Sequence, residues 1–121
     1  MKTVITIIAS FILFSGVAYV STPVSTDICD TGVCVVEFNA DFNKSNSVSW
    51  IEDLKDCGTS RVDISSSPNL QKKHKIVVVP TIVVFNEGYE VTRFQANIMM
   101  TMEATINDVQ NAIDDALMSD F

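Results

Sequence analysis

The sequence contains few of the residues on which common enzyme mechanisms depend. Its 121 residues include one histidine, three cysteines, four glycines and three prolines. The histidine, His74, follows two lysines and has no nucleophile beside it, so we expect no catalytic role for it. No glycine-rich nucleotide-binding loop and no internal repeat is present. We therefore expect a protein without a bound cofactor.

Positive charge is also scarce. The chain has 8 lysines and arginines against 15 aspartates and glutamates. Lys2 is the one charged residue among residues 1–26, so 7 basic and 15 acidic residues follow, a balance of −8. Nucleic acid and anionic lipid head groups are therefore poor candidate partners.

The length leaves room for one domain. Residues 1–20 are an apolar segment, and residues 21–32, which are rich in serine, threonine and proline, are predicted to form a linker. Residues 33–121 are predicted to be the folded domain. The roughly 95 residues beyond the N-terminal segment are enough for a single compact core.

The N-terminal segment contains the one long apolar run of the sequence. Residues 3–20 carry no charge, and as a helix they would be about 27 Å long, slightly less than the roughly 30 Å hydrocarbon core of a membrane. Three alternatives remain open: an uncleaved membrane anchor, a cleaved signal peptide and a buried helix. In the first two cases the domain is exported, either anchored and facing outside the cytoplasm, or secreted or periplasmic.

The three cysteines, Cys29, Cys34 and Cys57, leave at least one thiol unpaired or joined to another molecule. The spacing of Cys29 and Cys34 allows a disulfide if Gly32 turns the chain, but Cys34 also suits the start of a buried strand. A structural disulfide, two buried thiols and a working redox pair remain alternatives for these two residues. Cys57, beside Gly58, is expected to be a core or cap residue.

Hydrophobic patterning predicts alternating strands and helices. A near-continuous apolar strand indicates a central position in a sheet, and a helix is expected where apolar residues recur every three or four positions. The order of elements predicts an α/β sandwich with a mixed sheet. The expected elements are a strand over 33–39, a helix over 47–56, a strand over 61–64, a helix from 68 to 73, a hairpin of 81–86 with 89–95, and a helix over 101–118.

Two segments resemble the thioredoxin-like family. Val35–Phe42 is an apolar strand with an embedded acid and a closing aromatic residue, and Val79–Gly88 is a proline loop followed by an apolar strand and a glycine turn. The resemblance covers residues 33–118. It implies an α/β thioredoxin-like fold in which helices flank a mixed central sheet.

The chain departs from the family pattern in three places. The distance from Phe38 to Asp63 is short for the family, so the helix between them must be truncated. The first strand and helix of a full thioredoxin have no counterpart, and Ala96 stands where a glycine is expected. The resemblance is therefore to a divergent, minimal version of the family.

The resemblance places Asn43–Asn46 where the family carries Cys-Gly-Pro-Cys. A thiol at that position is activated by the N-terminus of a helix, whereas an amide neither ionises nor exchanges with disulfides. Two interpretations remain: an asparagine-capped helix start without an active function, or a repurposed polar contact site. No metal is expected, since no histidine or carboxylate pair converges there. The four degenerate positions are Asn43, Lys44, Ser45 and Asn46.

Glu37 occupies the position at which the family has a buried acid that assists its thiols. The carboxylate either faces a polar cavity or the surface, or is desolvated on a buried strand, where its pKa would rise. Because the thiols are absent, Glu37 is interpreted as a remnant without a catalytic role.

The proline loop is the feature on which a functional hypothesis can be built. In the family, the bond before the residue equivalent to Pro80 is cis, and the backbone equivalent to Val79 pairs with an extended segment of a partner. The alternative is that Pro80 serves the fold alone. Phe42 and Trp50 either flank the Asn43 turn as an exposed apolar rim or fill the core.

These observations lead to one hypothesis and two alternatives. The hypothesis is a non-catalytic thioredoxin-like domain, exported and tethered to the membrane by residues 3–20 when these are uncleaved. It would bind a protein or peptide over Phe42–Asn46 and Val79–Pro80. One alternative is a thiol-disulfide oxidoreductase that uses Cys29 with Cys34, or Cys57 alone; the other is a structural component of a membrane or particle assembly.

Overall fold

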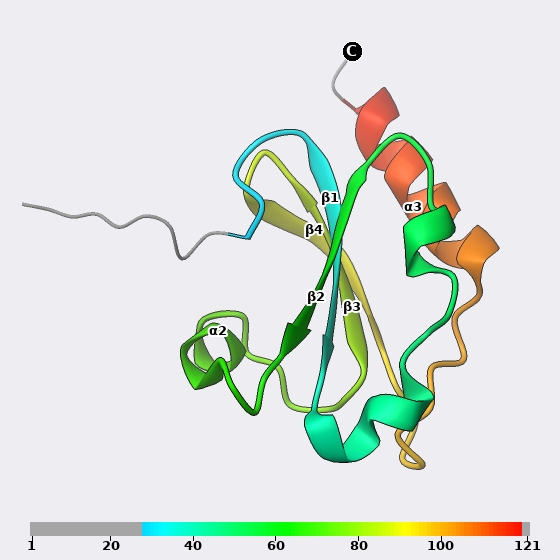
Figure 1. Cartoon of the computed structure of the whole chain (residues 1–121). Helices are drawn as coiled ribbons and strands as arrows, with labels where there is room; N and C mark the ends of the chain where they lie inside the picture. The colour runs from blue at the N-terminus through cyan, green and yellow to red at the C-terminus, as the bar shows by residue number, and fades with distance from the viewer. Residues whose placement is uncertain (1–27, 120–121) are drawn as a thin grey trace, which may run out of the picture.

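A computed structural model describes residues 28–119, which form a four-stranded sheet flanked by helices (Figure 1). The strand order is β2-β1-β3-β4. β1 pairs in parallel with β2 and antiparallel with β3, and β3 pairs antiparallel with β4, so the sheet is mixed, as predicted. The strands are β1 (Val33–Asn39), β2 (Gly58–Asp63), β3 (Thr81–Asn86) and β4 (Tyr89–Gln95).

Each face of the sheet is covered by a hydrophobic core. Strand β1 contributes to both cores because its successive side chains point to opposite faces. Val35 belongs to a core shared with helix α3 (Ile106–Met118), whereas Val36 and Phe38 belong to a second core. Helix α2 (Pro68–Lys73) packs Leu70 against this second core. Figure 1 shows α2 and α3 on opposite sides of the sheet. The apolar run of β1 thus reflects a strand buried on both faces.

The helix predicted over residues 47–56 is absent from the structure. The short 3₁₀ helix η5 (Ile51–Asp53) lies within this range, and a second 3₁₀ helix, η4 (Asp41–Asn46), precedes it. Side chains hold the backbone of Val48 here: its N–H donates to Glu37, and its carbonyl, which would accept from the N–H of residue 52 in an α-helix, accepts from Arg61. The apolar residues that suggested the helix, Val48, Ile51 and Leu54, are nevertheless buried.

Other boundaries differ more modestly from the prediction. β2 begins at Gly58, three residues earlier than expected. α3 begins at Ile106, not at residue 101, because Thr105 and Asp108 form a capping box that fixes the start of the helix. Helix α2 begins with proline in its first turn, as predicted, and the β3–β4 hairpin turns at Glu87 and Gly88, both with positive φ.

The predicted N-terminal segment, residues 1–20, lies outside the described residues, as does most of the predicted linker. Ile28 and Cys29, in the described part of the predicted linker, pack against the second core. Within residues 28–119, no helix combines the length and apolar character needed to cross a membrane.

Candidate functional site

The loop before β3 brings the proline and the asparagine segment together. The Val79–Pro80 peptide bond is cis, and both residues are buried. The loop is held by two hydrogen bonds: the Thr81 hydroxyl donates to the Val78 carbonyl at 2.7 Å, and the Ala96 N–H donates to the Pro80 carbonyl at 3.0 Å. Its backbone is therefore fixed from β3 and from the end of β4.

Asn43 lies in η4 and points inward, with only 4% of its surface exposed. Its side-chain nitrogen lies 3.1 Å from Asn39 Oδ1, 3.1 Å from the Met100 carbonyl and 3.4 Å from the Val79 carbonyl. Asn46 in turn donates to Asn43 Oδ1 at 2.8 Å. The structure thus places the predicted residues Asn43 and Val79 in direct contact.

The interpretation of Asn43 as a helix cap is wrong. Ala40 flanks the start of η4, and no side chain caps the helix. The carboxamide of Asn43 is satisfied in the interior because backbone carbonyls from two other segments converge on it. Lys44 and Ser45 are exposed, as expected for a surface turn, and Asn46 is half-buried.

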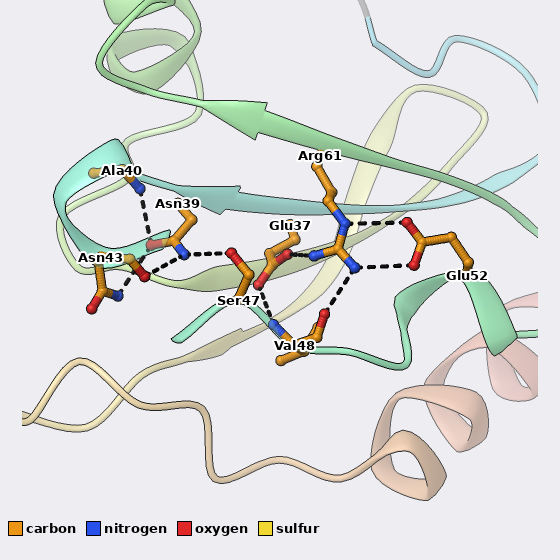
Figure 2. Close-up of polar contacts among 8 residues, drawn as sticks. All are labelled: Glu37, Asn39, Ala40, Asn43, Ser47, Val48, Glu52 and Arg61. Carbon is orange, nitrogen blue, oxygen red and sulfur yellow. Dashed lines mark hydrogen bonds and ion pairs between the residues drawn. The ribbon is translucent and has the colours of Figure 1, made fainter. Parts of the chain in front are cut away.

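Asn39, at the end of β1, was missed by sequence reasoning. Its Oδ1 accepts from the Ala40 N–H at 2.9 Å and from Asn43, and its Nδ2 donates to the Asn43 carbonyl and to the Ser47 hydroxyl (Figure 2). The side chain thereby shapes the turn from β1 into η4. A polar residue directly after an apolar strand is the sequence signal that could have identified it.

Glu37 is buried and paired. Its carboxylate accepts from the Val48 N–H at 2.8 Å and from the Arg61 guanidinium, which also reaches Glu52 (Figure 2). Burial raises the pKa of Glu37 above its ordinary value, although the bonds from Val48 and Arg61 oppose the rise. Arg61 was not predicted as its partner.

Glu37 also lines a pocket of about 300 Å³, together with Arg61 and Asp63. Of the two interpretations of Glu37 from the sequence, the structure shows the desolvated carboxylate on a buried strand, at the wall of this pocket. No group of three or more potential metal ligands occurs within the described part of the chain.

Phe42 and Trp50 have different environments. Phe42 is 74% exposed, so it does not fill the core, whereas Trp50 packs against the core beneath α3. Phe42 lines an apolar pocket of about 340 Å³ beside the proline loop. The other lining residues come from the end of β2, from α2 and from two loops: Ile64, Gln71, Ile76, Val77, Val78, Val79, Asn97, Ile98 and Met100.

The cysteines lie away from this pocket. Cys29 and Cys34 form a disulfide with a Cα–Cα distance of 6.0 Å. Cys34 is near the start of β1, and Asn39 at its end is about 17 Å further along the strand. Cys57 is free and half-buried against the core beneath α3, and burial, assisted by the charge of Asp56, raises the pKa of its thiol.

His74 is not the solvated residue that the preceding lysines suggested. Its half-buried ring packs against Phe38 and Phe85, with ring centroids 5.4 and 5.3 Å away. The histidine therefore contributes to the packing of the second core.

The arrangement of strands, helices and cis-proline loop can be compared with known proteins. No protein-family model and no curated protein matches the chain. Among solved structures, a point mutant of thioredoxin from Halobacterium salinarum superposes with a TM-score of 0.60 at 18% identity, covering 75% of this chain and 80% of that one. The fold is that of the thioredoxins.

Two further thioredoxins show the same likeness. Schistosoma mansoni thioredoxin aligns with a TM-score of 0.54 and 21% identity over 71% of this chain and 78% of its own. Fasciola hepatica thioredoxin aligns with a TM-score of 0.53 and 18% identity over 72% of this chain and 83% of its own. At such identities the likeness establishes the thioredoxin-like fold, and function must be argued from the site.

Proposed function

We propose that this thioredoxin-like domain is a non-catalytic binding module that holds an extended protein segment over Phe42–Asn46 and Val79–Pro80. The observation that carries the proposal is a row of backbone N–H groups in the proline loop, whose carbonyls at Val78, Val79 and Pro80 accept hydrogen bonds from within the chain. Within residues 28–119, the N–H groups of Val77, Val78 and Val79 donate to no acceptor. An extended segment that pairs with these groups would supply the missing partners.

The pocket beside this backbone indicates the chemistry of the segment. No charged residue lines it, and Phe42, Val77 and Ile98 on its rim are 74%, 78% and 97% exposed. A charged side chain would lose its hydration there without gaining a counter-ion. The proposed partner is therefore an uncharged segment that pairs through its backbone and places an aliphatic side chain in the pocket.

The polar residues at the site support binding without thiol exchange. Neither asparagine at positions 43 and 46 can form a mixed disulfide, and the nearest half-cystine in the sequence, Cys34, lies at the other end of β1. Export and tethering through residues 3–20 belong to the same proposal and rest on the apolar character of that segment.

Binding can be tested with a capped hexapeptide of alternating serine and valine, titrated into the full-length chain in detergent micelles. The V77E variant places a charge on the pocket rim and is expected to weaken binding at least tenfold. V91E is the matched control, since Val91 is also exposed but lies on β4 and does not line the pocket. Equal affinities of V77E and V91E, or no binding by the wild type, would refute the proposal.

The disulfide favours a second candidate function, a thiol-disulfide oxidoreductase that uses Cys29 and Cys34. In such a reaction a dithiol substrate would give two electrons and two protons to the disulfide and would itself become oxidised. Turnover in a disulfide-exchange assay that is lost in C29S and C34S, but kept in C57S, would establish this function. Cys57 is a poor nucleophile because its raised pKa lowers the thiolate fraction.

A further inference from the structure

Asn43 makes polar contacts with three different segments of the chain. Its carboxamide nitrogen faces Asn39 at the end of β1, Val79 in the proline loop and Met100 in the loop after β4. An amide nitrogen has two hydrogens, so the two acceptors at 3.1 Å each receive one, and the Val79 carbonyl at 3.4 Å shares one of them. Its oxygen is held by Asn46. The orientation of the carboxamide is therefore fixed.

Val79 and Met100 both line the apolar pocket. They belong to loops that are separated by β3 and β4 in the sequence, and the Asn43 side chain bonds to the carbonyl of each. The pocket therefore has two of its wall segments attached to one buried side chain.

Within residues 28–119, the loop of residues 97–101 has one hydrogen bond to a distant segment, the one from Asn43. Asn97 organises the loop internally: its Oδ1 accepts from the N–H groups of Met99 and Thr101, and its carbonyl accepts from the Met100 N–H. Among residues 28–119, the hydrogen bonds of this loop stay within residues 97–103 except for the one from Asn43 to Met100. The same loop exposes Ile98 and Met99.

We propose that Asn43 is a positioning residue for the binding surface: its carboxamide holds the 97–101 loop at a fixed distance from Val79 and so sets the width of the pocket. This inference rests on the proposed function of that surface. A cysteine at position 43 would have one weak hydrogen-bond donor, so it could not bond to the oxygens of Asn39, Val79 and Met100 together. A preorganised pocket binds more tightly because the loop need not be ordered when the partner arrives.

The N43D variant isolates this role. Aspartate has nearly the same shape as asparagine, but it replaces the two donors with an acceptor that faces the oxygens of Asn39, Val79 and Met100. We expect the affinity for the serine-valine hexapeptide to fall about tenfold or more, as the loss of one to two buried hydrogen bonds implies. We also expect faster hydrogen exchange at the Met100 and Thr101 amides.

One control and one substitute variant distinguish positioning from general stability. V109A removes part of a fully buried side chain in α3, away from the pocket, and should destabilise the fold while leaving the peptide affinity and the exchange of the 97–101 loop unchanged. If N43D does not fold, N43S replaces it, since serine is smaller and cannot span the same acceptors. All variants are measured in the full-length chain in detergent micelles.

The possible results separate the inference from the function on which it rests. The positioning role would be supported if the Asn43 variant bound the hexapeptide more weakly and exchanged the amide hydrogens of the 97–101 loop faster, while V109A kept the wild-type affinity and exchange rates. Wild-type affinity in a folded Asn43 variant would overturn the inference and leave the proposed function standing. Failure of the wild type to bind the hexapeptide would overturn both.

Discussion

Glu37 lies directly opposite Arg61 in the register of β1 and β2, and the two side chains form an ion pair. The carboxylate is buried, whereas 36% of the arginine side chain is exposed, where it also contacts Glu52. The guanidinium bonds to the Val48 carbonyl, and Glu37 bonds to the Val48 N–H. This cluster holds the segment between η4 and η5 against the sheet.

The raised pKa of Glu37 predicts how the stability of the domain depends on pH. The folded state binds the proton of Glu37 more tightly than the unfolded state, whose pKa is near 4.5. The stability from this group is therefore fully present below pH 4.5 and is lost as the pH rises through the folded-state pKa. The free energy of unfolding of the wild type, relative to E37Q, should fall over that range.

Urea unfolding of the wild type and E37Q between pH 4 and pH 8 measures this difference. Glu52 and Glu90 have lowered pKa values and act in the opposite direction. Glu90 pairs with Arg93 in both proteins, so its effect cancels, whereas Glu52 shares Arg61 with Glu37, so the comparison is repeated between E52Q and E52Q/E37Q. If the free energy of unfolding of the wild type, relative to that of E37Q, instead increased with pH, the pKa of Glu37 would be lowered in the folded state.

Arg61 is predicted to stabilise the fold chiefly through Glu37. R61M would leave the buried carboxylate without its counter-ion and is expected to cost about 2 kcal/mol at pH 7, less than a fully buried pair because the arginine is partly exposed. Urea unfolding gives the value. In E37Q the same change should cost clearly less, and equal costs in the two backgrounds would rule out the coupling.

The disulfide is predicted to stabilise the start of β1. The loop it closes is short, with a sequence separation of 5, so its removal in a C29S/C34S variant should cost about 2 kcal/mol. Reductant should lower the unfolding midpoint of the wild type and of C57S, but not that of C29S/C34S. A gain of two hydrogens in the intact mass on reduction would count the bond directly.

Restoring cysteines at the degenerate positions should not create a thioredoxin. Asn43 is buried, and η4 is a six-residue 3₁₀ helix, so a thiol in N43C would lack both solvent access and an α-helix N-terminus to lower its pKa. We expect the N43C/N46C variant to show no disulfide-reductase turnover. Alkylation should be slow in N43C and faster in N46C, whose site is half-buried, and rapid alkylation of N43C would contradict this account.

The regular elements were largely predictable from the sequence. The apolar runs of β1 and β3 indicate strands buried on both faces, Pro68 marks the first turn of α2, and Glu87-Gly88 marks the hairpin. These signals are local, because they depend on residue spacing and on the backbone preferences of proline and glycine. The resemblance to thioredoxins then supplied the expected fold, a mixed central sheet flanked by helices, and the structure supplied the order of its strands.

The segment from residue 40 to residue 57 could not be predicted in the same way. The spacing of Val48, Ile51 and Leu54 suits a helix, and all three are buried, but the backbone groups of Val48 are bound by side chains from β1 and β2. The irregular course of this segment is therefore held by contacts between residues 11 and 13 positions apart, which no local pattern of apolar residues predicts.

The sequence alone determined that this chain folds as an α/β domain with a proline loop and that no cysteine stands at Asn43 or Asn46. Only the tertiary structure decided what Asn43 does. Its partners, Val79 and Met100, are 36 and 57 residues away. Local sequence patterns therefore cannot predict that the carbonyls of both residues contact the side-chain amide of Asn43. Long-range convergence of this kind arises when the sheet brings its loops to one edge, so it is visible only after the chain has folded.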